Sequence, residues 1–257
     1  MKELLKKCDR IYRELPCCHS DGRTCNCYSC LCNEYFNTAD TYECKKKLSF
    51  YVLKYAPSFS TELYHYLVKS KILDRFNNEE LNILSIGCGC CHDLYCIAFY
   101  IKQRNLNINL SYTGIDKSTQ WEQLYSQDAV YLQQDVVKEC DLKGFDIIFI
   151  NKVFSTLYEN KHDKPFLDKL TEAIDRDMIF DAYLVFVDVN SKFKGRDKFN
   201  GAVAKKFNQE TKYYFDGYSG GTGSNWIHLG QKNVPKGEYF RSLSVKPIME
   251  TKKNSYF

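Results

Sequence analysis

The chain has 257 residues, of which 44% are hydrophobic and 26% are charged, so a disordered chain and a fibre are excluded and one large domain with a small appendage is expected. Its apolar runs are far shorter than the roughly 18 residues of a membrane span, and its start lacks the apolar stretch of a secretory signal, so we expect an intracellular, cytoplasmic protein. The net charge of +4 is uneven, because residues 190–257 carry thirteen basic and five acidic side chains.

The first fifteen residues predict a short amphipathic helix. Leu4, Cys8 and Ile11 recur at helical spacing against a charged face, and Pro16 ends the pattern. Residues 17–37 are polar and rich in cysteine, with no sustained periodicity, and this favours a loop.

Cysteine is concentrated near the N-terminus, where eight of the thirteen cysteines lie within the first 44 residues. In an unsecreted chain this pattern favours metal ligands over disulfides. We expect one or two structural zinc ions, each with four ligands, to order this segment. An iron–sulfur cluster and a loop of reduced thiols are the alternatives. The candidate ligands are Cys17, Cys18, His19, Cys25, Cys27, Cys30, Cys32 and Cys44.

Two further helices are predicted before the main domain. Apolar residues recur at helical spacing in 41–55 and again in 58–76, and Pro57 separates the two stretches. We therefore divide the chain into a small helical, cysteine-rich module over residues 1–76 and a main domain over residues 77–257.

From Leu81 onward, short apolar runs alternate with helical stretches, which is typical of an α/β fold around a parallel sheet. The helical stretches are 92–104, 120–127 and 164–175. Two later strand candidates, 211–218 and 239–247, have no helix between them and are expected to pair antiparallel. The five predicted parallel strands are 82–86, 110–115, 129–133, 145–150 and 183–189.

The first of these strands ends in a glycine turn that is suited to a ligand. Gly87 and Gly89 stand where the chain turns from a strand into a helix, so the backbone can approach a bound molecule. The second strand ends in Asp116, which can accept two hydrogen bonds from a ribose diol, and Asp135 follows the third strand, where it can accept from an adenine amino group. A tight turn that binds nothing is the alternative, and a nicotinamide site fits less well because His92 replaces the third glycine.

This arrangement resembles the Rossmann-like (class I) S-adenosylmethionine-dependent methyltransferases over residues 80–190. The resemblance implies a seven-stranded sheet with helices on both faces and an S-adenosylmethionine site. The sequence differs from the family pattern at Ser85, where an acidic residue is commoner, and at Cys90 and Cys91, where proline and glycine are common. The implied cofactor-binding residues are Ser85, Gly87, Gly89, Asp93, Asp116, Asp135 and Asn151.

Acceptor-positioning groups of such enzymes follow the fourth strand, where Asn151 and Lys152 are the candidate catalytic residues. Asn151 would bond a nucleophile and Lys152 would contact an anionic substrate. The alternative is a helix cap and a surface lysine. The Asp-Pro-Pro-Tyr motif of DNA amino methyltransferases and a Pro-Cys pair are both missing here, which disfavours ordinary DNA-base methylation.

The acceptor is expected to be RNA or another single-stranded nucleic acid, because the basic residues of 190–257 are interleaved with aromatic residues. A glycine-rich stretch at 217–226 is a candidate substrate loop. A protein or small-molecule methyltransferase is one alternative. A non-catalytic interaction protein that binds zinc and S-adenosylmethionine is another.

Overall fold

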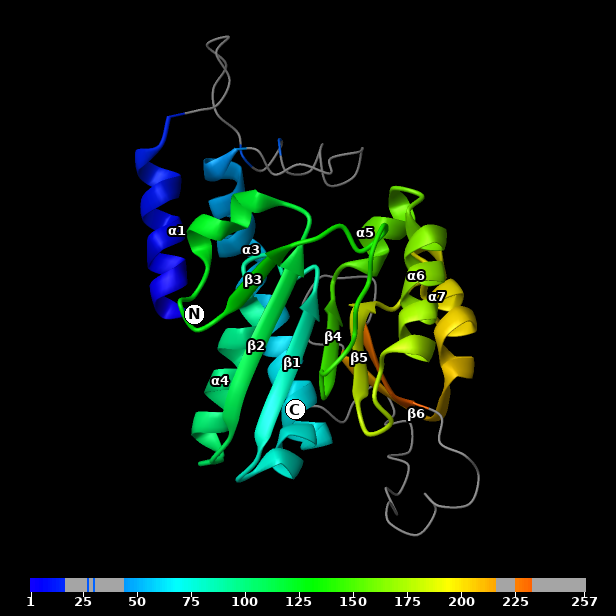
Figure 1. Ribbon diagram of the computed structural model, residues 1–257. Helices are drawn as coiled ribbons and strands as arrows, with labels where there is room; N and C mark the ends of the chain where they lie inside the picture. The colour runs from blue at the N-terminus through cyan, green and yellow to red at the C-terminus, as the bar shows by residue number, and fades with distance from the viewer. Residues whose placement is uncertain (17–26, 28–29, 31–43, 216–224, 233–257) are drawn as a thin grey trace.

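The computed structural model describes residues 1–16, 27, 30, 44–215 and 225–232. Within them, seven strands form one sheet in the order β3-β2-β1-β4-β5-β7-β6 (Figure 1). Five of these strands run parallel, as predicted. They are β1 (Glu80–Ile86), β2 (Asn109–Asp116), β3 (Val130–Gln133), β4 (Ile147–Asn151) and β5 (Tyr183–Val189).

The remaining two strands, β6 (Phe207–Phe215) and β7 (Asn225–Lys232), complete the sheet antiparallel. β6 overlaps the predicted strand 211–218. Its partner β7 was not predicted, because it follows a glycine-rich stretch and contains few apolar residues. The other predicted strand, 239–247, lies outside the described residues.

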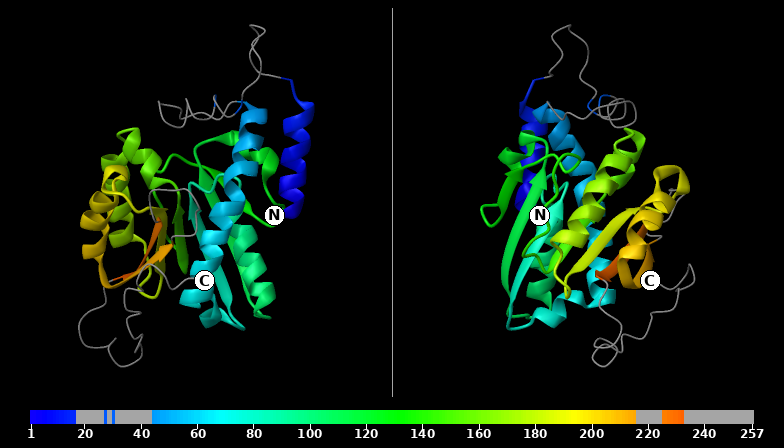
Figure 2. Two further views of the ribbon diagram at one scale, coloured as in Figure 1. Left: turned by 180° about the vertical axis from the view of Figure 1, so that it is seen from behind. Right: turned by 45° about the vertical axis from the view of Figure 1, so that its right-hand side comes forward.

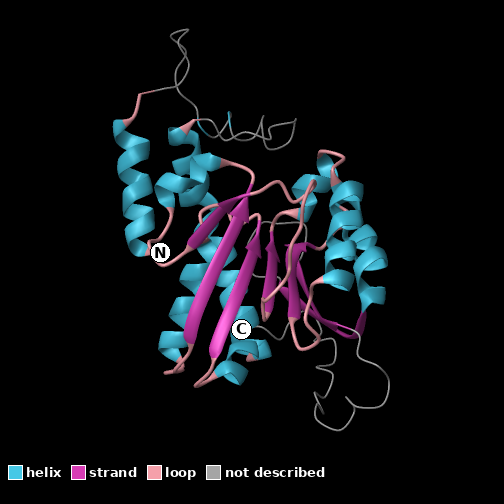
Figure 3. Ribbon diagram, in the orientation of Figure 1, coloured by secondary structure: helices cyan, strands magenta, loops and turns pink. Residues whose placement is uncertain are grey.

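Helices cover both faces of the sheet (Figures 2 and 3). Successive residues of a strand point to opposite faces, and the strands carry buried apolar residues on both. Ile83 packs with α3 (Lys45–Ser70), α4 (His92–Gln103) and the 3-10 helix η1 (Ile72–Phe76), whereas Leu84 packs with α5 (Phe154–Glu159), α6 (Asp163–Arg176) and α7 (Arg196–Val203). The predicted helix at 120–127 is instead the 3-10 helix η2 (Thr119–Leu124). Two short 3-10 helices, η3 (Lys192–Lys194) and η4 (Ala204–Lys206), flank α7.

The predicted break at Pro57 was wrong, because α3 continues through this residue. Its N-terminal half buries Val52 and Ala56 against α1 (Lys2–Glu14) and η2, and its C-terminal half buries Leu63 and Leu67 against β1 and α4. Packing on both sides of the proline outweighs the local cost of the missing N–H group. The predicted boundary at residues 76 and 77 stays a prediction, although α3 shares the core of the sheet.

Helix α1 forms as predicted and packs on α3 through Leu4 and Cys8. No helix in the described part of the chain is long and apolar enough to cross a bilayer.

Candidate active site

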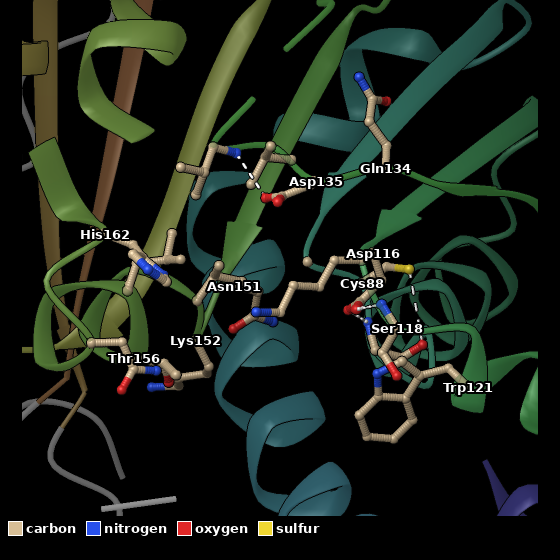
Figure 4. Close-up of a pocket in the computed structure, with 18 of the residues that line it drawn as sticks. Cys88, Asp116, Ser118, Trp121, Gln134, Asp135, Asn151, Lys152, Thr156 and His162 are labelled. Carbon is tan, nitrogen blue, oxygen red and sulfur yellow. Dashed lines mark hydrogen bonds between the residues drawn. The ribbon is translucent and has the colours of Figure 1, made fainter. Parts of the chain in front are cut away.

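A pocket of about 330 Å³ opens at the carboxyl ends of β1, β2 and β4 (Figure 4). Five segments line it: α3 through Tyr51, the turn after β1 with the start of α4, the end of β2 with η2, the segment after β3 and the segment after β4. The order of the strands reverses here, because β1 lies between β2 and β4. Open α/β sheets bind their ligands at such a switch point.

The predicted glycine turn forms one wall of the pocket. Gly87 has a φ of +65° and Gly89 a φ of +51°, both in the left-handed region that favours glycine. A Cβ atom at Gly87 would lie 2.4 Å from Cγ2 of Val153, so a side chain here would collide with the segment after β4. Backbone N–H groups of residues 87 and 88 donate to the carbonyl of Ile115, which fastens the turn to β2.

Asp116 at the end of β2 is held by the same turn. Its Oδ2 accepts from the N–H of Gly89 and its Oδ1 from the N–H of Ser118, each at 3.0 Å. Burial raises the pKa of Asp116, although these backbone N–H groups oppose the shift. Each carboxylate oxygen keeps a further lone pair for a ligand, as the predicted contact with a ribose diol requires.

The segment after β3 brings Asp135 to the pocket beside Gln134 and Val136. Asp135 accepts from the N–H of Val137 at 3.2 Å through Oδ1, and Nζ of Lys138 lies 3.6 Å from its Oδ2. Asp116 and Asp135 therefore line the same pocket, from neighbouring strand ends (Figure 4).

Two of the predicted cofactor residues do not line the pocket. Ser85 is buried inside β1. Asp93 is buried behind the turn, where its Oδ1 accepts from the hydroxyl of Tyr112 at 2.7 Å and from the N–H of Leu94 at 3.1 Å. These contacts support the packing of α4 on β2.

Asn151 and Lys152, the candidate catalytic residues, line the pocket after β4. Lys152 is not a surface lysine, because its Nζ lies 2.8 Å from Oε2 of Glu62 on α3 and the two side chains are 5% and 0% exposed. The backbone of Lys152 has a φ of +60°, which is strained for a residue with a side chain. The predicted contact of Lys152 with an anionic substrate stays a prediction.

Sequence reasoning missed His92 as a site residue. It is the first residue of α4, lines the pocket, and places Nε2 2.9 Å from Nδ2 of Asn151. Burial lowers the pKa of His92, the cation of Lys152 lowers it further, and Asp93 opposes them. A histidine directly after a glycine turn was the available signal.

Aromatic and polar residues complete the lining. Trp121 of η2 lies against the turn, 3.6 Å from where a Cβ of Gly89 would stand, and its ring meets Tyr51 of α3 edge-on with centroids 5.8 Å apart. On the opposite side, α5 and the residues after it contribute Thr156 and His162 (Figure 4). None of these four residues belongs to a recognisable local motif.

Most of the proposed metal ligands cannot be placed, because Cys17, Cys18, His19, Cys25 and Cys32 lie outside the described residues. Of the other three, Cys27 is buried, Cys30 is half-buried, and Cys44 caps α3 by accepting from the N–H of Lys47 at 3.5 Å. Among the described residues, no group of three or more histidine, cysteine or acidic side chains is arranged to hold a metal.

Comparison with known proteins shows a shared fold. No family model matches the chain, and no curated protein matches it by sequence. The N-methyltransferase NodS from Bradyrhizobium japonicum WM9, in complex with S-adenosylhomocysteine, is 15% identical, and the match covers 81% of this chain and 100% of NodS with a TM-score of 0.51. The plantazolicin methyltransferase BpumL, also in complex with S-adenosylhomocysteine, is 16% identical over 90% of this chain and 100% of its own, with a TM-score of 0.51. The chain therefore has the fold of class I methyltransferases.

Proposed function

We propose that the protein is a methyltransferase that uses S-adenosylmethionine. The observation that carries this proposal is Asp116, whose carboxylate is anchored to the glycine turn in the wall of a pocket at the switch point of the sheet. The likeness in fold to two methyltransferases that bind S-adenosylhomocysteine supports it.

The residues of the pocket fit the cofactor in kind. Asp116 offers acceptors for a ribose diol, Asp135 offers a carboxylate for an adenine amino group, and Gly87 and Gly89 place no side chain of their own in the pocket. S-adenosylmethionine, when bound, supplies a methyl group already activated by a sulfonium. The protein then has to align the acceptor and exclude water, and Asn151 is the candidate that touches the acceptor.

For the acceptor, two of the earlier alternatives remain proposals. NodS and BpumL are named an N-methyltransferase and a plantazolicin methyltransferase, and a small-molecule or protein acceptor is the proposal that this likeness supports. A single-stranded nucleic acid is supported by the thirteen basic and five acidic side chains of residues 190–257. Transfer of tritium from labelled S-adenosylmethionine to RNA, protein or small molecules of a cell extract separates the two.

Zinc in the cysteine-rich segment is a further part of the proposal. It is supported by the density of cysteine among residues 17–44, where seven of the thirteen cysteines of the chain lie. The zinc would order the segment and would take no part in methyl transfer.

Changing Asp116→Asn tests the function. The amide keeps the size of the side chain but loses the charge and one pair of acceptor sites, so affinity for S-adenosylhomocysteine should fall by at least about tenfold. Calorimetry measures the affinity, and circular dichroism checks the fold.

Asp128→Asn is the matched control, because Asp128 is exposed and does not line the pocket. This variant should bind like the unmodified protein. Equal affinities for all three proteins would refute the role of Asp116, and binding without any transfer of tritium would favour the non-catalytic alternative.

A further inference from the structure

Asn151 and His92 form a buried polar pair that cofactor recognition does not explain. Asn151 is the last residue of β4 and is 4% exposed, and it lies between Asp116 and His162 in the pocket (Figure 4). Its Nδ2 meets Nε2 of His92 at 2.9 Å, whereas its Oδ1 is buried without a hydrogen-bond partner among the described residues. Folded proteins rarely leave such an atom unpaired, so Oδ1 marks a place for a donor from a ligand.

The position of the protons on the His92 ring, meaning its tautomer and its charge, decides which way the Asn151 amide faces. A neutral ring with its proton on Nδ1 offers a lone pair on Nε2, which accepts from the amide N–H group and leaves Oδ1 to the pocket. A ring that carries a proton on Nε2, whether neutral or cationic, would donate from Nε2 and would turn the amide so that its NH₂ group faced the pocket. The charged groups around the ring are Asp93 on α4, Lys152 after β4, and Glu62 on α3, which is paired with Lys152.

Other features hold the ring in place. The backbone carbonyl of His92 accepts from the hydroxyl of Ser60 at 3.1 Å, and its ring packs against Phe59 with centroids 5.7 Å apart. Both contacts come from α3. This helix therefore holds the backbone and the ring of His92 in position, and the ring in turn contacts Asn151.

We propose that His92 is a positioning residue that turns the oxygen of Asn151 toward the pocket, and that this oxygen binds an N–H group of a neutral amine, which is the methyl acceptor. The inference rests on the proposed function and names the class of acceptor. An amine without an N–H group would leave Oδ1 unpaired, and the site would discriminate against it.

The chemistry of methyl transfer makes this contact useful. The lone pair of the amine nitrogen forms a bond to the methyl carbon, the bond from that carbon to sulfur breaks, and its electron pair stays on sulfur. The nitrogen gains positive charge as the bond forms, and its proton is then lost to water. Because its N–H group becomes a stronger donor, the bond to Oδ1 strengthens toward the transition state and accelerates the reaction.

A matched pair of small amines tests the proposal directly. Aniline is uncharged at neutral pH and carries two N–H groups, whereas N,N-dimethylaniline has none. Protein saturated with S-adenosylhomocysteine is titrated with each, and the nitrogen-15 resonance of the Asn151 side chain, assigned from Asn151→Asp, is followed. Aniline should shift this resonance and bind at least about fivefold more tightly. Equal binding of both amines would overturn the proposal.

Two variants separate positioning from packing. His92→Phe keeps a ring but removes the acceptor and should weaken aniline binding at least about fivefold, whereas His92→Gln restores an acceptor and should recover binding to within about twofold. In the unmodified protein the preference for aniline should be lost as His92 becomes protonated, below the ordinary histidine pKa of about 6.5, and His92→Gln should lack this loss. Equal binding by His92→Phe would contradict the role of His92.

The result is separable from the proposed function. Failure of the unmodified protein to bind S-adenosylhomocysteine would refute the function itself. Normal binding of S-adenosylhomocysteine, with no preference for aniline, would refute only the inference about His92 and the amine.

Discussion

At the scale of single residues, the buried pair of Lys152 and Glu62 shows how the pocket is fixed to the helices beside it. Lys152 holds a left-handed backbone, its N–H donates to the carbonyl of Val187 at 2.8 Å, and its Nζ reaches Glu62 at 2.8 Å. The same Nζ lies 5.4 Å from the centre of the Phe59 ring. These contacts offset the backbone strain and link the end of β4 to α3.

Removing one partner of this pair should destabilise the protein strongly, because the remaining buried charge loses its ion-pair partner. We expect Glu62→Leu or Lys152→Met to lower the free energy of unfolding by about 3–5 kcal/mol. The double variant should lose much less than the sum of the two, since two apolar side chains pack without an unpaired charge. Urea denaturation of the four proteins measures the coupling.

The exposed pair of Lys164 and Asp168 on α6 provides the control, with the same separation of 2.8 Å. Its side chains are in water, and its double-variant cycle should show no measurable coupling. If the double variant at Glu62 and Lys152 lost as much free energy of unfolding as the two single variants together, the two charges would not be coupled.

At the scale of elements, the turn after β1 approaches the segment after β4 closely, and both line the pocket. Two features at position 87 require glycine. The backbone is left-handed, and a Cβ atom would collide with the side chain of Val153. Gly144 has a φ of +83° with no atom within 4 Å of its missing Cβ, so it shares only the first of these requirements.

Comparing Gly87→Ala with Gly144→Ala therefore separates the two costs. Gly144→Ala should lower the free energy of unfolding by roughly 1 kcal/mol, the cost of a left-handed alanine. Gly87→Ala should cost about 1–3 kcal/mol more and weaken binding of S-adenosylhomocysteine, because Val153 and the residues beside it must move. Urea denaturation and calorimetry give the two quantities.

Adding Val153→Ala to Gly87→Ala should recover part of the lost stability, because the atoms in closest contact are removed. Equal losses for the two glycine variants, or no recovery in the double variant, would show that the contact with Val153 is unimportant.

At the scale of the whole molecule, helices α1 and α3, which we assigned to the N-terminal module from the sequence, also pack against residues that line the pocket. Leu4 of α1 and Leu48 of α3 share a core cluster with Cys90 of the turn and Trp121 of η2. The cysteine-rich residues lie between α1 and α3 in sequence, so a metal that orders them would also steady these helices.

The chain purified without added metal should accordingly contain at least one zinc ion, and a chelator should lower its melting temperature. Mass spectrometry measures the metal. The double variant Cys27→Ser with Cys30→Ser should contain less zinc, whereas Cys140→Ser should keep it, because Cys140 lies in the core between the sheet and α6. A chain without stoichiometric zinc would show the prediction to be wrong.

The sequence alone was enough to predict the five parallel strands, the glycine turn and the position of Asp116 at a strand end. These features depend on local properties, namely apolar runs, glycine at a turn and the order of elements along the chain. Asp135 reaches the pocket for the same reason, since parallel strands bring their carboxyl ends to one edge of the sheet.

Only the tertiary structure decided the partners of these residues. His92 and Asn151 are 59 residues apart in sequence, and Lys152 meets Glu62 on a helix that we predicted from the sequence to end at Pro57. Asp93, which we expected to bind the cofactor, lies outside the pocket and accepts a hydrogen bond from Tyr112 instead. Such pairings depend on how helices pack against the sheet, and the packing free energy of distant residues outweighs the local preferences that a sequence pattern records.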